Sequence, residues 1–186
     1  MDQELSDAEL VDRALTKDHA AWDKLCERHY KTAIAAAFAR LHDVDAAHDC
    51  AQEAFLEAAR RLHTLRERSK FGNWIYGISR QQAILVVRKH KRHREALQTK
   101  TDESKTLIPI KSPPEQMGKA EQLQSVRRAL GEINEIYSEV LILKYVDGRS
   151  HDEIAKNLGI SMAAVDKRLM RGKDLLRESL GRWKDE

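Results

Sequence analysis

Aromatic residues and cysteines are scarce in this sequence, and each shortage narrows what the chain can be. Aromatic residues make up 5% of the 186 residues, while charged residues make up 34%, which suits a soluble, helical protein. The two cysteines, Cys26 and Cys50, each lie in an apolar helical pattern and are not spaced as metal ligands are. We therefore expect two buried, reduced thiols in a cytoplasmic protein.

Long hydrophobic runs are missing as well. The first ten residues are acidic and polar, and they lack the basic start and apolar core of a secretory signal. The longest run of small apolar residues, at about 33–39, is far too short to span a bilayer. These absences predict a cytoplasmic location and no membrane segment.

The sequence also lacks the patterns that an enzyme would need. It has no nucleophile–base pair, no cluster of metal ligands and no glycine-rich loop to hold a phosphate. His90 and His93 are one helical turn apart, but they lie in a basic run, so we expect them to be solvated. The expectation is a protein without catalytic activity, metal or cofactor. The net charge of +3 says little about partners, whereas the distribution of charge says more.

The clearest pattern that is present covers residues 147–180, which predict two helices joined by a tight turn. Ser150 and Glu153 have the spacing of a capping box at the start of the first helix. Gly159 can adopt the left-handed conformation that ends this helix, and Ser161 can cap the second. The pattern is typical of a helix-turn-helix.

The second helix of this pair has two different faces. Val165, Leu169 and Leu176 mark the face that turns inward. A DNA-reading helix presents its outer face to base edges in the major groove. Here the outer face would carry Met162, Ala163, Asp166, Lys167, Met170 and Arg171. An ordinary helical hairpin with solvated charges is the alternative that this stretch leaves open.

The N-terminal half predicts three helices before residue 63. Capping residues place one from Ser6 to about Leu15 and one after Asp18, and the spacing of apolar residues indicates a third over about 43–62. The third helix has an inner face of alanines and larger apolar residues, and its other face carries Asp49, Gln52, Glu53, Leu56 and Arg60. Leu56 in this polar face is either a single exposed leucine or part of a docking surface for another helix.

Residues 63–73 are polar and poorly periodic, which predicts a loop, and a helix follows. This helix closes in a dense basic run at 88–94. Such a run suits contacts with DNA phosphates, although a solvated helix end would have the same composition. Phe71, Trp74 and Tyr76 supply rings of the kind that unstacked bases pack on, but Trp74 fits the core better.

Helical periodicity is lost from residue 98 to residue 116. Thr, Ser and Lys dominate this segment together with the pair Pro113–Pro114. Such composition is typical of a connection between domains, so we interpret 98–116 as a flexible linker.

Two more helices are predicted after the linker, at 119–130 and 134–146, with Asn134 as the cap of the second. Together with the helix-turn-helix they make a four-helix unit. No strand pair and no internal repeat is evident. The predicted fold is all-α, with two small helical domains over 1–97 and 117–186, the second containing the helix-turn-helix.

Three segments resemble the extracytoplasmic-function (ECF) sigma factors, the small two-domain bacterial initiation factors of RNA polymerase. Residues 45–62, DAAHDCAQEAFLEAARRL, resemble the family's D-A-E-D-L-V-Q-E-x-F segment. Residues 71–84, FGNWIYGISRQQAI, resemble its F-x-x-W-L-Y-x-I-A-R-N segment. Residues 133–176 resemble its L-P-x-x-x-R-x-V segment and the helix-turn-helix that follows. The motifs occur in the family's order on either side of a linker, and the resemblance covers nearly the whole chain.

The resemblance implies separate roles for the two domains. The first would bind the clamp helices of core RNA polymerase through Asp49, Gln52, Glu53 and Leu56. It would also recognise and open the −10 promoter element, using Arg66, Lys70, Phe71, Trp74, Arg80, Gln81, Arg88 and Lys89. The second would bind the −35 element as duplex DNA through Ser161, Met162, Asp166, Lys167, Arg168, Met170 and Arg171. Family membership would also allow an anti-sigma factor as a partner.

The sequence departs from the family pattern at several positions. The differences are His48 for Glu, Gln81 for Asn, Leu85 for Asp, Asn134 for Pro, Ala163-Ala164 for Gly-Thr and Asp166 for Lys or Arg. An Asp that faces DNA repels phosphate but can accept a hydrogen bond from a cytosine amino group. Asp166 therefore predicts an atypical upstream promoter element.

Two other functions compete with this interpretation. One is a helix-turn-helix transcriptional regulator that acts without stable polymerase association, but the N-terminal half lacks the alternating strands and helices of a receiver domain. The other is a helical interaction protein, against which the basic run at 88–94 argues. We therefore expect a sigma factor that binds core RNA polymerase and directs promoter-specific transcription initiation.

Overall fold

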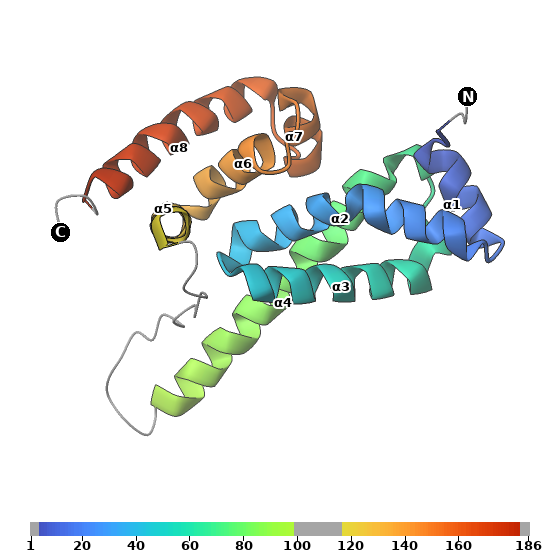
Figure 1. Ribbon diagram of the computed structural model, residues 1–186, viewed down its shortest axis with the longest axis horizontal. Coiled ribbons are helices and arrows are strands. Elements are labelled where there is room, and N and C mark those ends of the chain that lie inside the picture. Colours follow the sequence, from blue (N-terminus) through green and yellow to red (C-terminus); the bar gives the residue numbers. More distant parts are fainter. Residues whose placement is uncertain (1–3, 99–116, 183–186) are drawn as a thin grey trace.

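The computed structural model describes residues 4–98 and 117–182, with side chains for 4–93 and 123–181, and its regular secondary structure is all helical (Figure 1). The N-terminal half holds α1 (Asp7–Leu15), α2 (His19–Leu41), α3 (Val44–Arg61), the short 3-10 helices η1 (Leu62–Thr64) and η2 (Arg68–Lys70), and α4 (Phe71–Gln98). The C-terminal half holds α5 (Met117–Glu132), α6 (Glu135–Tyr145), α7 (His151–Leu158) and α8 (Met162–Arg182). The all-α prediction is confirmed, while the linker predicted at 98–116 lies, apart from Gln98, outside the described residues.

Side-chain caps begin four helices where the sequence predicts them. The Ser6 hydroxyl accepts a hydrogen bond from the backbone N–H of Glu9 at 3.3 Å, and the Ser6 N–H donates to the Glu9 carboxylate at 2.8 Å. Asp18 and Asp43 cap α2 and α3 by accepting from the N–H groups three residues on, at 3.1 and 2.9 Å. Asn134 caps α6 in a similar way. Short polar side chains therefore fix the starts of these helices.

Small side chains let α2 and α3 lie close together. Several of their alanines are completely buried, so the two helices approach without large side chains between them; these include Ala33, Ala36, Ala39, Ala47, Ala51, Ala54 and Ala58. Rings close one end of this core, where Trp22 meets Phe55 and Phe71 edge-on with centroid separations of 6.4 and 6.1 Å. The N-terminal half is therefore a tight bundle of α2, α3 and α4.

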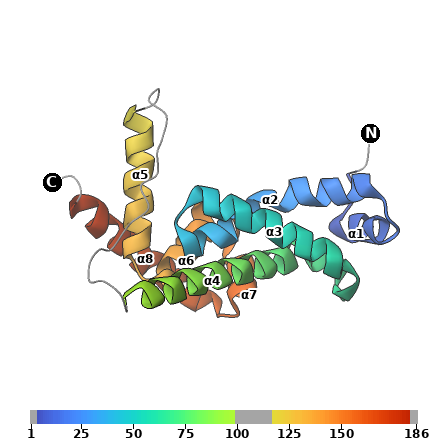
Figure 2. The ribbon, with the colours of Figure 1, turned by 90° about the horizontal axis from the view of Figure 1, so that it is seen from below.

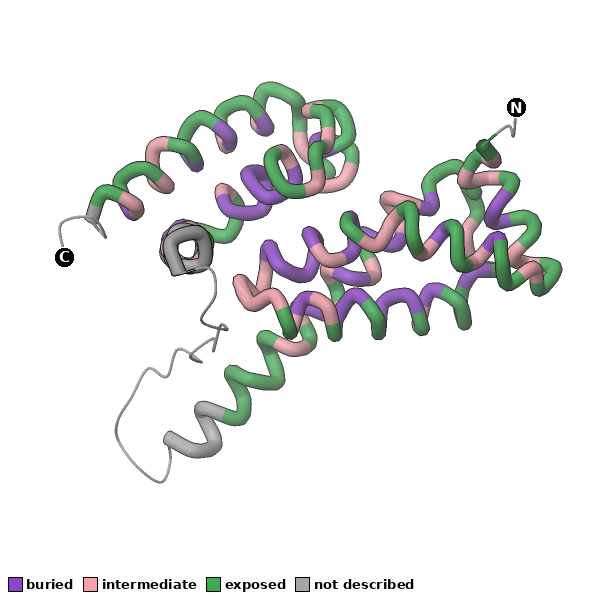
Figure 3. Tube along the Cα trace, viewed as in Figure 1, coloured by how far each residue is buried: buried purple, intermediate pink, exposed green. Residues whose placement is uncertain are grey.

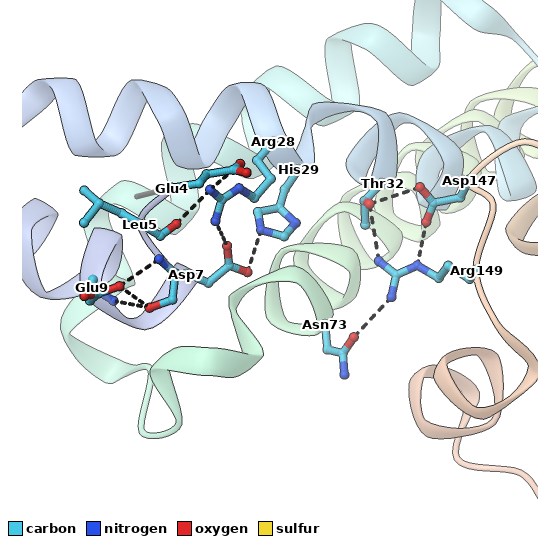
Figure 4. Close-up of polar contacts among 11 residues, drawn as sticks. Glu4, Leu5, Asp7, Glu9, Arg28, His29, Thr32, Asn73, Asp147 and Arg149 are labelled. Atoms are coloured by element: carbon cyan, nitrogen blue, oxygen red, sulfur yellow. Dashed lines mark hydrogen bonds and ion pairs between the residues drawn. The ribbon is translucent and has the colours of Figure 1, made fainter. Parts of the chain in front are cut away.

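An ion-pair cluster fastens α1 to α2 (Figure 4). Arg28 donates to one oxygen of the Asp7 carboxylate at 2.7 Å, and Nε2 of His29 lies 2.8 Å from the other. Burial alone would raise the pKa of Asp7, but the hydrogen bonds from His29 and Arg28 outweigh it and lower that pKa. The carboxylate is therefore charged at neutral pH, and its contribution to stability is lost as the pH falls through its lowered pKa.

The C-terminal half is built around α6, which packs against α5, α7 and α8. Val140 and Leu143 of α6 are fully buried, whereas Ile136 of the same helix is 42% exposed. A Cβ atom added at Gly172 would lie 3.2 Å from the Leu141 side chain, so this glycine lets α8 approach α6 closely. The predicted four-helix unit is confirmed for the described residues.

The two halves pack against each other. Helix α6 lies on α2, and α7 reaches α4 (Figures 1 and 2). Buried residues gather along α2, α3 and α6 (Figure 3). One hydrophobic cluster includes Ala36 and Tyr76 from the N-terminal half together with Val140 and Leu143 from the C-terminal half. The sequence predicts two domains but gives no indication of this shared core.

The turn of the helix-turn-helix supplies a stability prediction. Gly159 has a φ of +64°, which costs an alanine about 1 kcal/mol, whereas Gly77 lies in α4 with open space around its Cα. Gly159→Ala should therefore lower the free energy of unfolding by about 1 kcal/mol, and Gly77→Ala should raise it by roughly 0.5–1 kcal/mol because alanine favours a helix. Urea denaturation of both variants measures the difference, and equal shifts of the same sign would contradict this account of the turn.

Candidate nucleic-acid and protein interfaces

The outer face of α3 is polar, acidic and fully accessible. Asp49, Gln52 and Glu53 are exposed, and Leu56 between them is 52% exposed. The opposite face of the helix is buried against α2 and α4. Within the described residues α3 contacts none of α5 to α8, so packing of the two halves leaves this face uncovered. An exposed leucine framed by acidic groups is a suitable contact for a basic or amphipathic helix of another protein.

The segment between α3 and α4 differs from the predicted loop. Residues of η1 and η2 are helical, and α4 begins at Phe71, three residues earlier than predicted. Arg66 and Lys70 are exposed, but the Phe71 side chain is completely buried against Trp22. The assignment of Phe71 to DNA contact is therefore wrong for this structure, because a ring at the centre of the aromatic cluster cannot stack on a base. Half-buried Trp74 belongs to the same cluster.

The outer face of α4 is basic and continuous. Gln81, Arg88 and Lys89 are exposed, and the basic run continues through residue 93 with exposed side chains. Arg80, about two helical turns before Arg88, is different, because its Nε donates to Glu139 of α6 at 2.8 Å. One cation of the predicted DNA-binding set is therefore engaged by the other half of the molecule.

The helix-turn-helix has the predicted geometry. Ser150 and Glu153 form the capping box, with the Glu153 N–H donating to Ser150 Oγ at 3.3 Å. Hydrogen bonds from the backbone N–H and the hydroxyl of Ser150 hold the pKa of Glu153 below its usual value. Gly159 is left-handed, and Ser161 accepts from the Ala164 N–H at 3.2 Å as the cap of α8. The caps fix where α7 ends and α8 begins.

The first turns of α8 present the predicted reading face to the outside. Val165 and Leu169 are buried inward. Arg168 is half-buried, and the remaining predicted contacts are exposed, namely Ser161, Met162, Asp166, Lys167, Met170 and Arg171. Met162 and Met170 are 49% and 65% exposed.

Asp166 on this face has a partner that the sequence does not indicate. Nδ1 of His151, at the start of α7, lies 2.8 Å from the Asp166 carboxylate. Asp166 is thus held in place by the preceding helix.

A buried carboxylate joins the two halves of the molecule. Glu139 of α6 is 4% exposed, and all three of its donors come from the N-terminal half. Tyr76 donates to it at 2.8 Å, Arg80 at 2.8 Å and Arg40 at 3.1 Å. Burial and then the Glu139 charge raise the pKa of the Tyr76 hydroxyl, so that it stays protonated and donates. Burial lowers the pKa of Arg40, which Glu139 opposes.

A second polar cluster joins the halves near the turn between α6 and α7 (Figure 4). The Thr32 hydroxyl donates to Asp147 at 3.0 Å. Arg149 donates to the same hydroxyl at 3.3 Å and to the Asn73 side-chain oxygen at 3.2 Å. The Arg149 guanidinium also lies 5.7 Å from the centre of the Tyr76 ring. The two clusters therefore meet around Tyr76.

The sequence analysis does not predict that these residues join the two halves, although the sequence contains one indication of it. Glu139 lies three residues before Ile142 and four before Leu143, so it falls on the buried side of α6. A carboxylate on an apolar stripe needs donors from elsewhere. Which residues supply them depends on how the halves pack, and periodicity carries no information on that.

The described residues contain no group of three or more side chains positioned to hold a metal ion, and none of their helices is long and apolar enough to cross a membrane.

Comparison with known proteins identifies both halves. Residues 25–93 match the model of sigma-70 region 2, and residues 123–176 match that of sigma-70, region 4. The ECF RNA polymerase sigma-E factor of Escherichia coli strain K12 is 29% identical, with 95% of each chain covered. A probable RNA polymerase sigma factor, RfaY of Xanthomonas campestris pv. campestris, is 33% identical over 86% of this chain, which spans 40% of that protein's length.

A solved structure has a similar fold. The sigma factor RpoE of Bartonella quintana, in complex with the anti-sigma factor NepR, matches 86% of this chain and 96% of its own with a TM-score of 0.64. The sequence identity of 21% limits this likeness to the fold.

The cysteines supply a prediction about reactivity. Cys50 is buried, as expected, but Cys26 is half-buried. Burial, with a smaller effect of Asp23, raises the pKa of Cys26 to about 11, and burial also raises the pKa of Cys50. At pH 8 about one Cys26 in a thousand is then a thiolate, so a disulfide reagent should label the native protein about a hundredfold more slowly than the unfolded chain. Cys26→Ser separates the two thiols, and rapid labelling of native Cys26 would contradict its assigned environment.

Proposed function

Because this chain belongs to the extracytoplasmic-function (ECF) sigma factors, we propose that it binds core RNA polymerase through α3 and brings it to promoters recognised by α4 and α8. A sigma factor directs transcription initiation, and this is the function of the chain. The residue assignments rest on the exposure of all three faces and on the geometry of the helix-turn-helix. The chain itself supplies recognition and no catalysis, and it acts in the cytoplasm.

The polymerase contact is assigned to Asp49, Gln52, Glu53 and Leu56. Their side chains share one accessible side of α3, and no helix of the C-terminal half approaches it. The −10 element is assigned to the α3–α4 connection and the outer face of α4, where Arg66, Lys70, Gln81, Arg88 and Lys89 are exposed. Their positive charges suit the phosphates of an opened strand.

The −35 element is assigned to the outer face of α8. Arg171 can bond a guanine at two atoms, Lys167 suits a phosphate, and Met170 suits a thymine methyl. Asp166 suits a cytosine amino group, and its pairing with His151 fixes the direction from which a base must approach. An anti-sigma factor is a further proposed partner, supported by the Bartonella structure with its bound NepR.

Run-off transcription tests this function directly. Purified chain and core polymerase are combined with genomic fragments, and a sigma factor yields transcripts from discrete start sites. A helix-turn-helix regulator would bind fragments without yielding such transcripts, and a helical interaction protein would do neither.

Charge reversal on α3 should weaken polymerase binding. Asp49→Lys with Glu53→Lys places two positive charges on the proposed face, and we expect affinity for core polymerase to fall about tenfold or more. Both side chains are exposed, so the free energy of unfolding should change by no more than about 0.5 kcal/mol per site. Glu27→Lys, at an exposed position of α2, is the matched control. Affinity equal to that of the control would remove α3 from the interface.

Two substitutions on α8 should have different effects on duplex binding. Arg171→Ala should remove about 1–3 kcal/mol of preference at one base pair. Lys167→Ala should weaken all duplexes similarly and reduce the salt dependence of binding by about one unit of slope. The measurement is a titration of the full chain with −35 duplexes carrying single-base changes, at several salt concentrations. Intact affinity and preference in both variants would mean that α8 does not read DNA.

A further inference from the structure

The donors around Glu139 form a site that belongs to the N-terminal half alone. Arg40 comes from α2, and Tyr76 and Arg80 lie one turn apart on α4. They converge on the Glu139 carboxylate, at 2.8 to 3.1 Å, which α6 of the other half supplies, and Arg40 also pairs with Glu135 of the same helix. If α6 moved away, two guanidinium groups and a phenol would remain facing one point, with their nearest counter-charge gone.

This set of donors suits a phosphate. Guanidinium groups bind phosphate and carboxylate oxygens with the same planar geometry, and a phenol adds a neutral donor. The donors also exceed what Glu139 takes up, because Nε of Arg40 is buried without a hydrogen-bond partner. A phosphodiester, with two non-bridging oxygens that share one negative charge and two ester oxygens, offers more acceptors than a carboxylate does. Here the Glu139 carboxylate stands in for that group.

The position of the site indicates where the phosphate would come from. Arg80 is followed on α4 by Gln81 and then by the basic run that starts at Arg88. The site therefore lies on the same helix as the residues assigned above to the opened −10 strand. Asn73, at the other end of the same helix, is also engaged by the C-terminal half, through Arg149 (Figure 4).

We propose that Arg40, Tyr76 and Arg80 form an anion site for a backbone phosphate of the single-stranded −10 element, and that Glu139 occupies this site while the two halves are closed. The proposal rests on the function proposed above. Single-stranded DNA and α6 then compete for the same donors, so the closed chain binds the −10 strand weakly until the C-terminal half moves away.

The first experiment removes the competing charge. Glu139→Gln keeps the shape of the side chain but loses the carboxylate, so the open, binding-competent fraction should rise. We expect the full-length variant to bind a fluorescent single-stranded 12-mer about fivefold more tightly than the wild type, because apparent affinity scales with that fraction. The same titration with a 12-mer whose central linkages are uncharged methylphosphonates should show no such gain.

Two further variants separate opening from binding. Asp147→Asn weakens the second cluster at Thr32 and Arg149 while it keeps every donor of the anion site, and it should also tighten binding of the 12-mer. Arg40→Gln loosens closure as well but removes a donor, so it should abolish the gain when combined with Glu139→Gln. Tyr76→Phe is the milder test of the site and should reduce the gain, and circular dichroism confirms the helical content of each variant. Small-angle X-ray scattering should show the Glu139→Gln and Asp147→Asn variants as more extended than the wild type.

Three results would overturn the proposal. They are an unchanged affinity in Glu139→Gln despite an extended chain, an equal gain for the methylphosphonate strand, and a gain that survives Arg40→Gln. Inorganic phosphate at millimolar concentration distinguishes the two sources of the anion. If the site binds a phosphate of the strand, inorganic phosphate should displace little of the 12-mer, whereas full displacement would indicate a site for free phosphate instead.

Run-off transcription keeps the two proposals separate. Transcripts together with unchanged affinities overturn the anion site alone, whereas absent transcripts with the expected gains overturn the promoter role and support the site.

Discussion

A carboxylate removed from water has to be met by donors with good geometry, and in this molecule Glu139 imposes that condition on both halves. Desolvating such a charge costs several kcal/mol, and removing a partner of a buried pair typically costs 3–5 kcal/mol. The donors Arg40, Tyr76 and Arg80 come from two helices of the N-terminal half. The position of α6 on α2 is therefore specified by polar contacts, while the shared apolar cluster around Val140 and Tyr76 supplies the burial.

The same packing divides the proposed interfaces into covered and uncovered ones. The outer face of α3 and the first turns of α8 point away from the contact between the halves and remain exposed. Arg80 and Asn73 on α4 instead bond to residues of the C-terminal half. The chain thus leaves the faces proposed for protein docking and duplex binding exposed, while part of the face proposed for the single strand is engaged internally.

Local features of the structure could be predicted from sequence because their causes are local. Capping by Ser6, Asp18, Ser150 and Asn134 depends on residues within one turn. Gly159 ends α7 because a glycine readily adopts the left-handed conformation that the turn requires. The exposure of Leu56 follows from its place opposite the alanine face of α3.

Other features depend on residues far apart in the chain. The family resemblance predicts a DNA contact for Phe71, but its ring is buried against Trp22 from a different helix. His151 and Asp166 meet only because α7 and α8 are packed together. The set around Glu139 joins positions separated by 59 to 99 residues, and periodicity within one helix contains nothing about such a meeting. The family resemblance covers the motifs but not this contact.

The uncovered position of α3 has a consequence for the order of assembly. Core polymerase can bind the closed chain, because the outer face of α3 that would contact it is already exposed. Encounter and opening are then separate events, and opening is unimolecular. Holoenzyme formation should show a fast phase whose rate rises with polymerase concentration, followed by a slow phase whose rate does not. Substitutions between the halves would change the slow phase and leave the fast one as it was.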